Sequence, residues 1–170
     1  RAPYFSLTKE VLWAPEILGS EGFVYSSSVL PSFNPQSGYP EAPREPFRWP
    51  NGLIEFPSPT LGLGKFRLPI LGGAYLRLSP KLLVKVAQRI STKKQGAWSY
   101  CHPYDFDIDE EFKVREENGW LFSKLLFARR HLMLNRIKDI VTTGSLSLGQ
   151  IANTASVTNQ FSIWDPLQKS

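Results

Sequence analysis

The sequence is poor in residues that form disulfides and metal sites. Among its 170 residues there is one cysteine, Cys101, and there are two histidines, His102 and His131. A single cysteine excludes an internal disulfide bond and a cysteine-rich zinc site. The two histidines are far apart in the sequence, so they do not form a pair with metal-ligand spacing. We therefore expect this chain alone to hold no catalytic metal ion.

Long hydrophobic runs are also absent. No apolar segment approaches the length needed to cross a membrane, and no signal peptide opens the chain. The chain begins at Arg1, and its only methionine is Met133. We therefore expect a processed piece or a fragment, and the sequence leaves its location open.

The charge balance is mildly basic, with 20 Lys and Arg against 15 Asp and Glu and a net charge of +5. Such a chain is able to bind nucleic acid, an anionic membrane or an acidic polymer. The excess lies in two segments expected to be helical, and a solvated basic helix face explains it. We therefore expect neither nucleic acid nor a membrane as partner. A nucleic-acid site would use Lys124, Arg129, Arg130, Arg136 and Lys138.

Prolines and aromatic residues gather in residues 31–59, which hold eight of the fourteen prolines. The same segment contains seven large apolar residues: Phe33, Tyr39, Phe47, Trp49, Leu53, Ile54 and Phe56. A disordered linker lacks such content, so we expect an ordered excursion packed on the domain, with short strands near 53–56. The domain is expected to span 1–151, and the Ser, Thr, Asn and Gln-rich segment 152–170 is expected to be a loosely ordered tail.

The middle of the chain predicts a strand, a helix and a second strand. Residues 74–78 alternate like a strand, and Ser79-Pro80 then opens a helix. The second strand is expected at 97–101. Such a unit normally connects two parallel strands, so the sequence predicts an α/β fold with mainly parallel strands. The apolar stripe of this helix is expected to face the core of the domain, and it consists of Leu82, Leu83, Val86, Ala87 and Ile90.

The last third is expected to be helical between 120 and 141, with a break near 129–131. Gly144 ends this helical part, and residues 146–151 are expected to form a short edge segment.

His102 is the main candidate for chemistry. It ends the apolar run 97–101 and is followed by Pro103. In parallel α/β folds, functional side chains lie at the C-terminal ends of strands. The alternative is a histidine that ends a strand and hydrogen-bonds a neighbour. Cys101 would point to the opposite face of the strand, and we expect it to be a small buried residue.

The acidic residues after His102 do not match a calcium site. Asp105, Asp107 and Asp109 are not followed by the glycine that a calcium-binding loop requires, because residue 110 is Glu. We therefore expect these carboxylates to belong to a solvated loop.

Three stretches together resemble the C-terminal portion of a polysaccharide deacetylase, of the carbohydrate esterase type associated with bacterial exopolysaccharide loci. Residues 1–6 resemble the family's Arg-x-Pro motif. Residues 22–28 resemble its Gly-Tyr-x-Tyr-Asp-Ser-Ser segment, with Ser26 in place of the aspartate. Residues 100–107 resemble its Leu-His-Pro motif with trailing acids.

The resemblance implies a distorted parallel (β/α) barrel that hydrolyses N-acetyl amides on a sugar polymer with the help of a metal ion. It implies that His102 protonates the leaving amine as general acid and that Arg1 orients the catalytic base. The family's Asp-Asp and His-x-x-x-His motifs normally precede the Arg-x-Pro motif and are not in this sequence. A divalent metal, zinc or similar, is therefore expected in the complete enzyme, held by the missing N-terminal half, and the isolated chain is expected to be inactive.

The expected substrate is an N-acetylated polysaccharide or oligosaccharide. Candidate substrate-binding residues are Tyr4, Trp49, Tyr75 and Tyr104, because aromatic rings stack on sugars. The alternative function is a non-catalytic carbohydrate-binding module, and the aromatic residues could equally be core residues. The implied location is the bacterial cytoplasm or the cell envelope, and the sequence does not choose between them.

Overall fold

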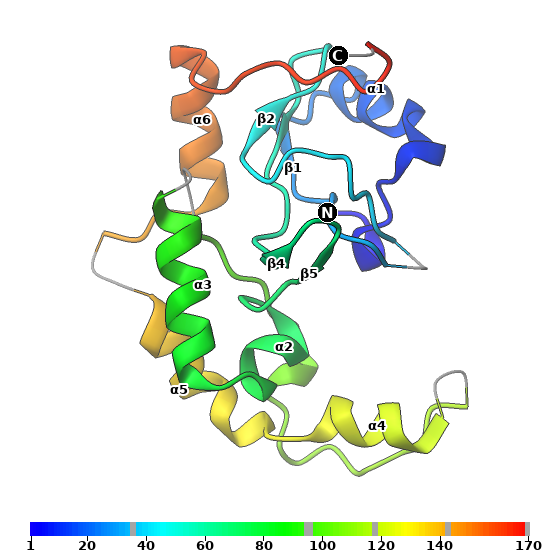
Figure 1. The fold of residues 1–170 in the computed structure, drawn as a ribbon, viewed down its shortest axis with the longest axis vertical. Helices are drawn as coiled ribbons and strands as arrows, with labels where there is room; N and C mark the ends of the chain where they lie inside the picture. Colours follow the sequence, from blue (N-terminus) through cyan, green and yellow to red (C-terminus); the bar gives the residue numbers. More distant parts are fainter. Residues whose placement is uncertain (35–36, 94–96, 117–118, 142–143, 169–170) are drawn as a thin grey trace.

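A computed structural model describes residues 1–34, 37–93, 97–116, 119–141 and 144–168 (Figure 1). The first part contains the 3-10 turns η1 (Pro3–Phe5) and η2 (Lys9–Val11), helix α1 (Trp13–Ser20), and strands β1 (Tyr25–Ser26), β2 (Phe47–Arg48) and β3 (Ile54–Glu55). The strand order is β1-β3-β2, with β1 parallel and β2 antiparallel to β3. The strand predicted near 53–56 is therefore confirmed.

The second part begins with an antiparallel hairpin of β4 (Leu61–Leu63) and β5 (Phe66–Leu68). Helices α2 (Gly73–Leu78), α3 (Lys81–Lys93), α4 (Gly119–Phe127), α5 (Met133–Ile140) and α6 (Leu148–Thr158) follow. In Figure 1 these helices lie below and beside the two sheets, and α4 extends to one side. None of the helices in the described ranges is long and apolar enough to span a membrane.

The proline-rich segment contributes to the core. Tyr39, Phe47, Trp49 and Leu53 are each at most 5% exposed and form one buried cluster with Leu7, Val29 and Ala42. Residues 35 and 36 of this segment lie outside the described residues. The described remainder is thus an integral part of the packing around β2 and β3.

The predicted strand, helix, strand unit is wrong. Residues 74–78 belong to helix α2, which buries Leu76 and Arg77. Five alternating residues are too few to distinguish a strand from a short helix, and Gly73 starts the helix with a positive φ of 51°. In the second predicted strand, Tyr100 alone makes a β-bridge, parallel to Gly72. Cys101 is exposed, which corrects the expectation of a buried residue.

These sheets are small and of mixed direction, so the parallel barrel stays a prediction. Residues 97–101 bind to their neighbours mainly through side chains. The indole of Trp98 donates to the carbonyl of Pro57, and the hydroxyl of Ser99 donates to the carbonyl of Leu71. Side-chain bonds of this kind anchor the segment without a regular strand ladder.

Helix α3 begins after Ser79-Pro80 as predicted, but it buries a different face. Val84 and Ala87 are 3% exposed and pack in a cluster with Leu76 and Met133. Apart from Ala87, the predicted core stripe is exposed: Leu82 72%, Leu83 42%, Val86 37% and Ile90 36%. The helix therefore has apolar residues on two faces, and sequence periodicity alone did not identify the buried one.

The helix break near 129–131 is confirmed. Helix α4 ends at Phe127, Arg129 has a positive φ of 57°, and the 3-10 turn η4 (Arg130–Leu132) leads into α5. The expected edge segment at 146–151 is wrong, because Ser147 caps helix α6. Its hydroxyl accepts a hydrogen bond from the backbone N–H of Gln150, and the side chain of Gln150 accepts one from the N–H of Ser147.

The expected loosely ordered tail is instead packed against the core. Ala152 and Ala155 are fully buried, and Phe161 is 5% exposed. The ring of Trp164 lies 5.0 to 5.4 Å from the rings of Tyr39, Phe47 and Trp49. The backbone adds two hydrogen bonds between Arg48 and residues 162 and 164. Small and aromatic residues thus give this polar segment its packing surface, and residues 169–170 lie outside the described ones.

Candidate functional site

The two residues assigned catalytic roles by the resemblance lie together. A terminal nitrogen of the Arg1 guanidinium is 3.1 Å from Nε2 of His102, although 101 positions separate them in the sequence. The guanidinium also lies over the rings of Phe5, at 4.9 Å, and Tyr100, at 4.6 Å. These two rings make an edge contact with each other at 5.0 Å. The aromatic pair therefore fixes where Arg1 points.

A short turn holds His102. Pro103 begins the 3-10 turn η3 (Pro103–Asp105), and His102 is the residue just before it. The carboxylate of Asp105 accepts a hydrogen bond of 2.9 Å from the His102 backbone N–H, and its Oδ2 lies 3.4 Å from Nδ1 of the ring. Proline at the first position and aspartate at the third suit the start of such a turn.

The contacts of the imidazole determine which nitrogen carries the proton. A guanidinium has only donors, so Nε2 of His102 accepts the hydrogen bond from Arg1. The proton of the neutral ring therefore lies on Nδ1, which faces the Asp105 carboxylate. The side chain of His102 is 36% exposed while that of Asp105 is completely buried. Nδ1 thus faces the buried carboxylate, and Nε2 faces Arg1.

A buried arginine lies behind the histidine. Arg77 on helix α2 is completely buried, and its guanidinium lies 3.4 Å from Oδ1 of Asp105. It also donates to the carbonyls of Leu126 and Ala128 at the end of helix α4. Burial lowers the pKa of Arg77, and the neighbouring Asp105 carboxylate opposes that shift. The order Arg77, Asp105, His102, Arg1 forms a continuous line of polar contacts from the interior to the surface.

Sequence reasoning missed Arg77 and Asp105. Asp105 was expected in a solvated loop, and Arg77 on one face of a strand. The spacing of Asp105 three residues after His102, with proline between, is the signal of a capped turn and could have identified a buried role for Asp105. Nothing in the sequence around Arg77 signals its partner, because the pair depends on how α2 packs.

The candidate substrate-binding residues occupy different environments. The Tyr104 ring stacks on His102 with centroids 4.8 Å apart and an angle of 7° between the planes. Burial, followed by the charge of Asp105, raises the pKa of Tyr104. Tyr4 is 81% exposed and Tyr75 is 41% exposed. Trp49 is 2% exposed within the core, so it has no face to offer a sugar ring, and its assignment is corrected.

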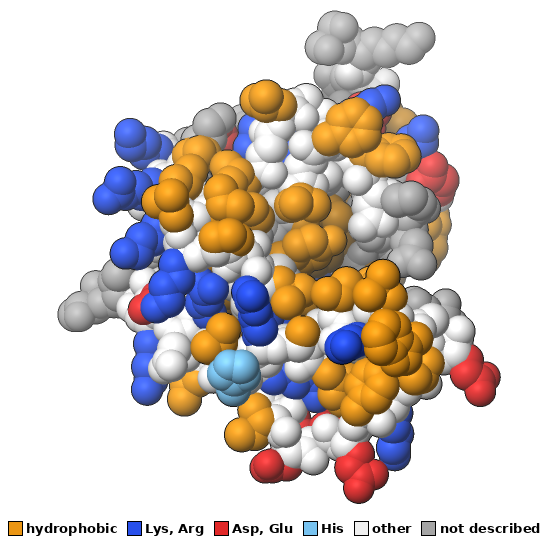
Figure 2. Space-filling model, turned by 60° about the horizontal axis from the view of Figure 1, so that its bottom comes forward, with side chains coloured by type: hydrophobic (Ala, Val, Ile, Leu, Met, Phe, Trp, Pro, Cys, Tyr) orange, Lys and Arg blue, Asp and Glu red, His pale blue; other side chains and the backbone are white. Residues whose placement is uncertain are grey.

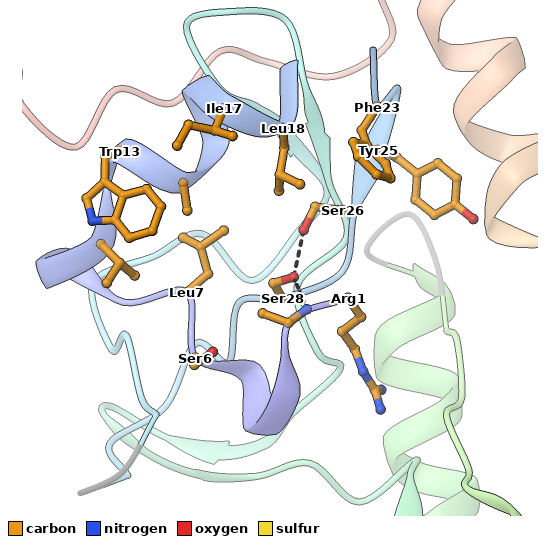
Figure 3. Close-up of a pocket in the computed structure, with 13 residues that line it drawn as sticks. Arg1, Ser6, Leu7, Trp13, Ile17, Leu18, Phe23, Tyr25, Ser26 and Ser28 are labelled. Atoms are coloured by element: carbon orange, nitrogen blue, oxygen red, sulfur yellow. Dashed lines mark hydrogen bonds between the residues drawn. The ribbon is translucent and has the colours of Figure 1, made fainter. Parts of the chain in front are cut away.

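Residues 26–28 anchor the segment that carries Arg1. The hydroxyl of Ser28 accepts hydrogen bonds from the backbone N–H of Ala2 and from the hydroxyl of Ser26 (Figure 3). Oε1 of Glu55, on β3, accepts from the backbone N–H groups of Ser28 and Val29 at 2.6 and 3.0 Å. Sequence reasoning missed Glu55, although it lies between the apolar residues Ile54 and Phe56. Its carboxyl group fixes the strand end to which Ala2 is bound.

Glu55 is completely buried, and burial raises its pKa above the ordinary value of 4.5. The hydrogen bonds from Val29 and Ser28 and the nearby side chains of Ser26 and Trp49 oppose that shift. Within the described ranges, Oε2 of Glu55 has no partner with hydrogen-bond geometry. The carboxyl group is therefore easier to protonate than a solvated glutamate.

A cavity of about 560 Å³ lies between helix α1 and strand β1. Figure 3 shows Trp13, Ile17 and Leu18 on one side of it and Ser26 and Ser28 on another. The serine hydroxyls already bind each other and Ala2, so the cavity surface is mainly apolar. The Arg1 side chain points away from this cavity in the figure.

The described residues do not fit the divalent metal that the resemblance implies. In the described ranges, no three His, Cys, Asp or Glu side chains are grouped so that they could hold a metal ion. The arrangement around His102 can bind an anionic or hydrogen-bond-accepting group through Arg1 and exchange a proton at Nε2.

Comparison with known proteins identifies a family but no activity. Residues 27–151 match the model of a family described as a domain of unknown function (DUF3473). Neither the curated proteins nor the solved structures contain a match. The matched range includes His102, Asp105, Arg77 and Glu55, and Arg1 lies before it. The match covers most of the chain, which therefore belongs to the DUF3473 family, a domain of unknown function.

Proposed function

We propose that this chain supplies the proton-transfer part of a metal-dependent deacetylase that removes N-acetyl groups from a polysaccharide. The observation that carries the proposal is the His102 ring, which is fixed through Nδ1 by the buried carboxylate of Asp105 and presents Nε2 to Arg1 at the surface. A buried carboxylate that orients the ring is the usual support for a histidine acid or base. The motif resemblance adds the reaction type, and the distorted parallel barrel remains part of the proposal.

His102 would protonate the nitrogen that leaves when the amide bond breaks. In the neutral ring Nε2 accepts a hydrogen bond from Arg1, so the Arg1 guanidinium must first move away from Nε2, which then takes up a proton from solvent. The proton then passes from Nε2 to the amine. Asp105 stabilises the imidazolium during this cycle, and the Arg77 guanidinium keeps the carboxylate in place.

Arg1 is proposed to turn toward the carboxylate that acts as the base. A planar guanidinium binds a carboxylate through two parallel hydrogen bonds, which suits this orienting role. The base and the ligands of a zinc-like metal would come from the N-terminal half of the barrel. An N-acetylated polysaccharide or oligosaccharide would pass over Tyr104, whose ring covers one face of His102.

The decisive experiment uses the full-length protein and N-acetylated oligosaccharides, with acetate release and metal content measured together. His102→Ala should reduce turnover roughly 10²–10⁴-fold with unchanged metal content. His131→Ala is the matched control, because His131 is the other histidine and is exposed in η4. If folded His102→Ala retains its metal and deacetylates at the parent rate, the proposal is wrong, and His102 is a structural residue.

The alternative, a non-catalytic carbohydrate-binding module, has less support. Of its four candidate aromatic residues, Trp49 is buried, and Tyr104 has one face against His102. Sugar binding that depends on Tyr4 and Tyr75 but not on His102, in a full-length protein without hydrolytic activity, would favour this alternative.

A further inference from the structure

Helix α3 has three distinct faces. One face packs into the core through Val84 and Ala87. A second face carries four exposed aliphatic side chains: Leu82, Leu83, Val86 and Ile90. A third carries four cations, Lys81, Lys85, Arg89 and Lys93, together with Thr92. It lies beside the aliphatic face, because residues three and four positions apart are neighbours on a helix. The helix contains no acidic residue.

Most of the positive charge on this helix has no partner. Lys81 forms an exposed ion pair of 3.1 Å with Asp139 of α5. Among the described residues, Lys85, Arg89 and Lys93 form no ion pair and are exposed. Figure 2 shows hydrophobic side chains next to Lys and Arg side chains at the left of the view, the side on which α3 lies in Figure 1. The sequence alone led us to expect a solvated basic face and no membrane partner. A solvated face accounts for the cations but not for four aliphatic side chains in water.

Two other occupants of this face are disfavoured. A second copy of the chain would bring the cations of one α3 against those of another, and like charges in contact repel. A stable protein interface uses about 20–30 residues on each side, whereas nine residues of α3 are exposed. A bilayer needs no such area, because a few aliphatic side chains and several cations suffice for peripheral binding.

We propose that α3 binds the surface of an anionic phospholipid membrane, lying in the interface with Leu82, Leu83, Val86 and Ile90 among the acyl chains and with Lys85, Arg89 and Lys93 at the headgroups. The helix has 13 residues, about 20 Å, which is too short to span a bilayer but sufficient to lie along its surface. Val84 and Ala87 remain buried against the protein, so binding does not require unfolding. The proposal is independent of the deacetylase proposal, because neither Arg1 nor His102 takes part.

The test is co-sedimentation of the 170-residue chain with vesicles. The chain should bind vesicles of phosphatidylglycerol and phosphatidylcholine in equal parts and should bind pure phosphatidylcholine much more weakly. Each cation near such a surface contributes about 1 kcal/mol, so Lys85→Gln/Arg89→Gln should weaken binding about 30-fold. Lys9→Gln/Lys113→Gln changes the net charge equally at exposed sites on other segments and should have a much smaller effect.

A second pair of variants tests the aliphatic face. Leu82→Gln/Val86→Gln should weaken binding by at least tenfold, because two aliphatic side chains no longer leave water. Leu121→Gln on α4, a residue 67% exposed, should bind like the parent. Circular dichroism first confirms that each variant has the parent's helix content.

Three results would overturn the proposal. Equal binding to both kinds of vesicle would show that the cations do not contribute to binding. A loss of binding in Leu121→Gln but not in the α3 variants would show that α4, and not α3, inserts into the bilayer. If the parent chain bound neither kind of vesicle, the membrane proposal would be wrong, and an acidic protein would be the partner to test for this face.

Discussion

Replacement of Asp105 by alanine should strongly destabilise the fold. Asp105 is fully buried and lies 3.4 Å from the fully buried guanidinium of Arg77. Without Asp105, the Arg77 charge stays buried with only the Leu126 and Ala128 carbonyls as partners. Removing one member of a buried ion pair costs about 3–5 kcal/mol, a large part of the stability of an ordinary domain.

The measurement is urea unfolding followed by tryptophan fluorescence. For an m value of about 2 kcal/mol/M, the midpoint of Asp105→Ala should fall by about 2 M. Asp109→Ala is the matched control, because Asp109 is exposed in the same loop and should change stability by less than about 0.5 kcal/mol.

A double variant separates the ion pair from the other contacts of Asp105. Arg77→Met alone should also be costly, because it leaves the carboxylate buried without its cation. Arg77→Met/Asp105→Leu should cost less than the sum of the two single changes by more than about 1 kcal/mol, because both charges are then removed. Additive effects, or an Asp105→Ala midpoint equal to that of Asp109→Ala, would refute the view that this pair supports His102.

Two further predictions concern the rest of the core. Because burial raises the pKa of Glu55 above 4.5, its contribution to stability is complete below pH 4.5 and is lost as the pH rises through the folded-state pKa. Glu55→Gln keeps the acceptor for Ser28 and Val29, so its stability relative to the parent should increase from pH 4.5 to neutrality in urea titrations; a difference independent of pH would contradict this. Trp164→Ala should lower the free energy of unfolding by about 3 kcal/mol, because its ring packs on Tyr39, Phe47 and Trp49. Leu167→Ala, at a site 79% exposed, is its control, and equal effects of the two would exclude a structural role for the tail.

Local signals predicted the boundaries of several elements. Ser79-Pro80 before α3, the break around Arg129 and the strand at 54–55 all agree with the structure. Each depends on backbone chemistry within a few residues, such as the fixed φ of proline or a left-handed residue between two helices. Elements of this kind can be predicted because distant parts of the chain need not be known.

The failures have the opposite origin. Residues 74–78 alternate like a strand but form a helix, because Gly73 takes a left-handed conformation and Leu76 and Arg77 find partners on other helices. The aromatic residues show the same limit. Trp49 is buried and Tyr4 exposed, and no local pattern distinguishes them.

The candidate site illustrates how far motif reasoning extends. The resemblance gave Arg1 and His102 separate catalytic roles, and the structure places the two side chains 3.1 Å apart. The motif does not indicate which residues hold the two side chains in these positions. Arg1 is anchored through Ala2 and Ser28 to the buried Glu55, and His102 is anchored through Asp105 to the buried Arg77.

Each of these two anchors ends in an ionisable group without access to water, Glu55 on β3 and Arg77 on α2. Their desolvation is costly, and for each it is offset by hydrogen bonds to backbone atoms from a different part of the chain. A change in the packing of either element would therefore move one side chain of the Arg1 and His102 pair relative to the other. The geometry of the site therefore depends on β3, α2 and α4 as much as on the two motif residues, and the proposed proton transfer would require positions within a fraction of an ångström.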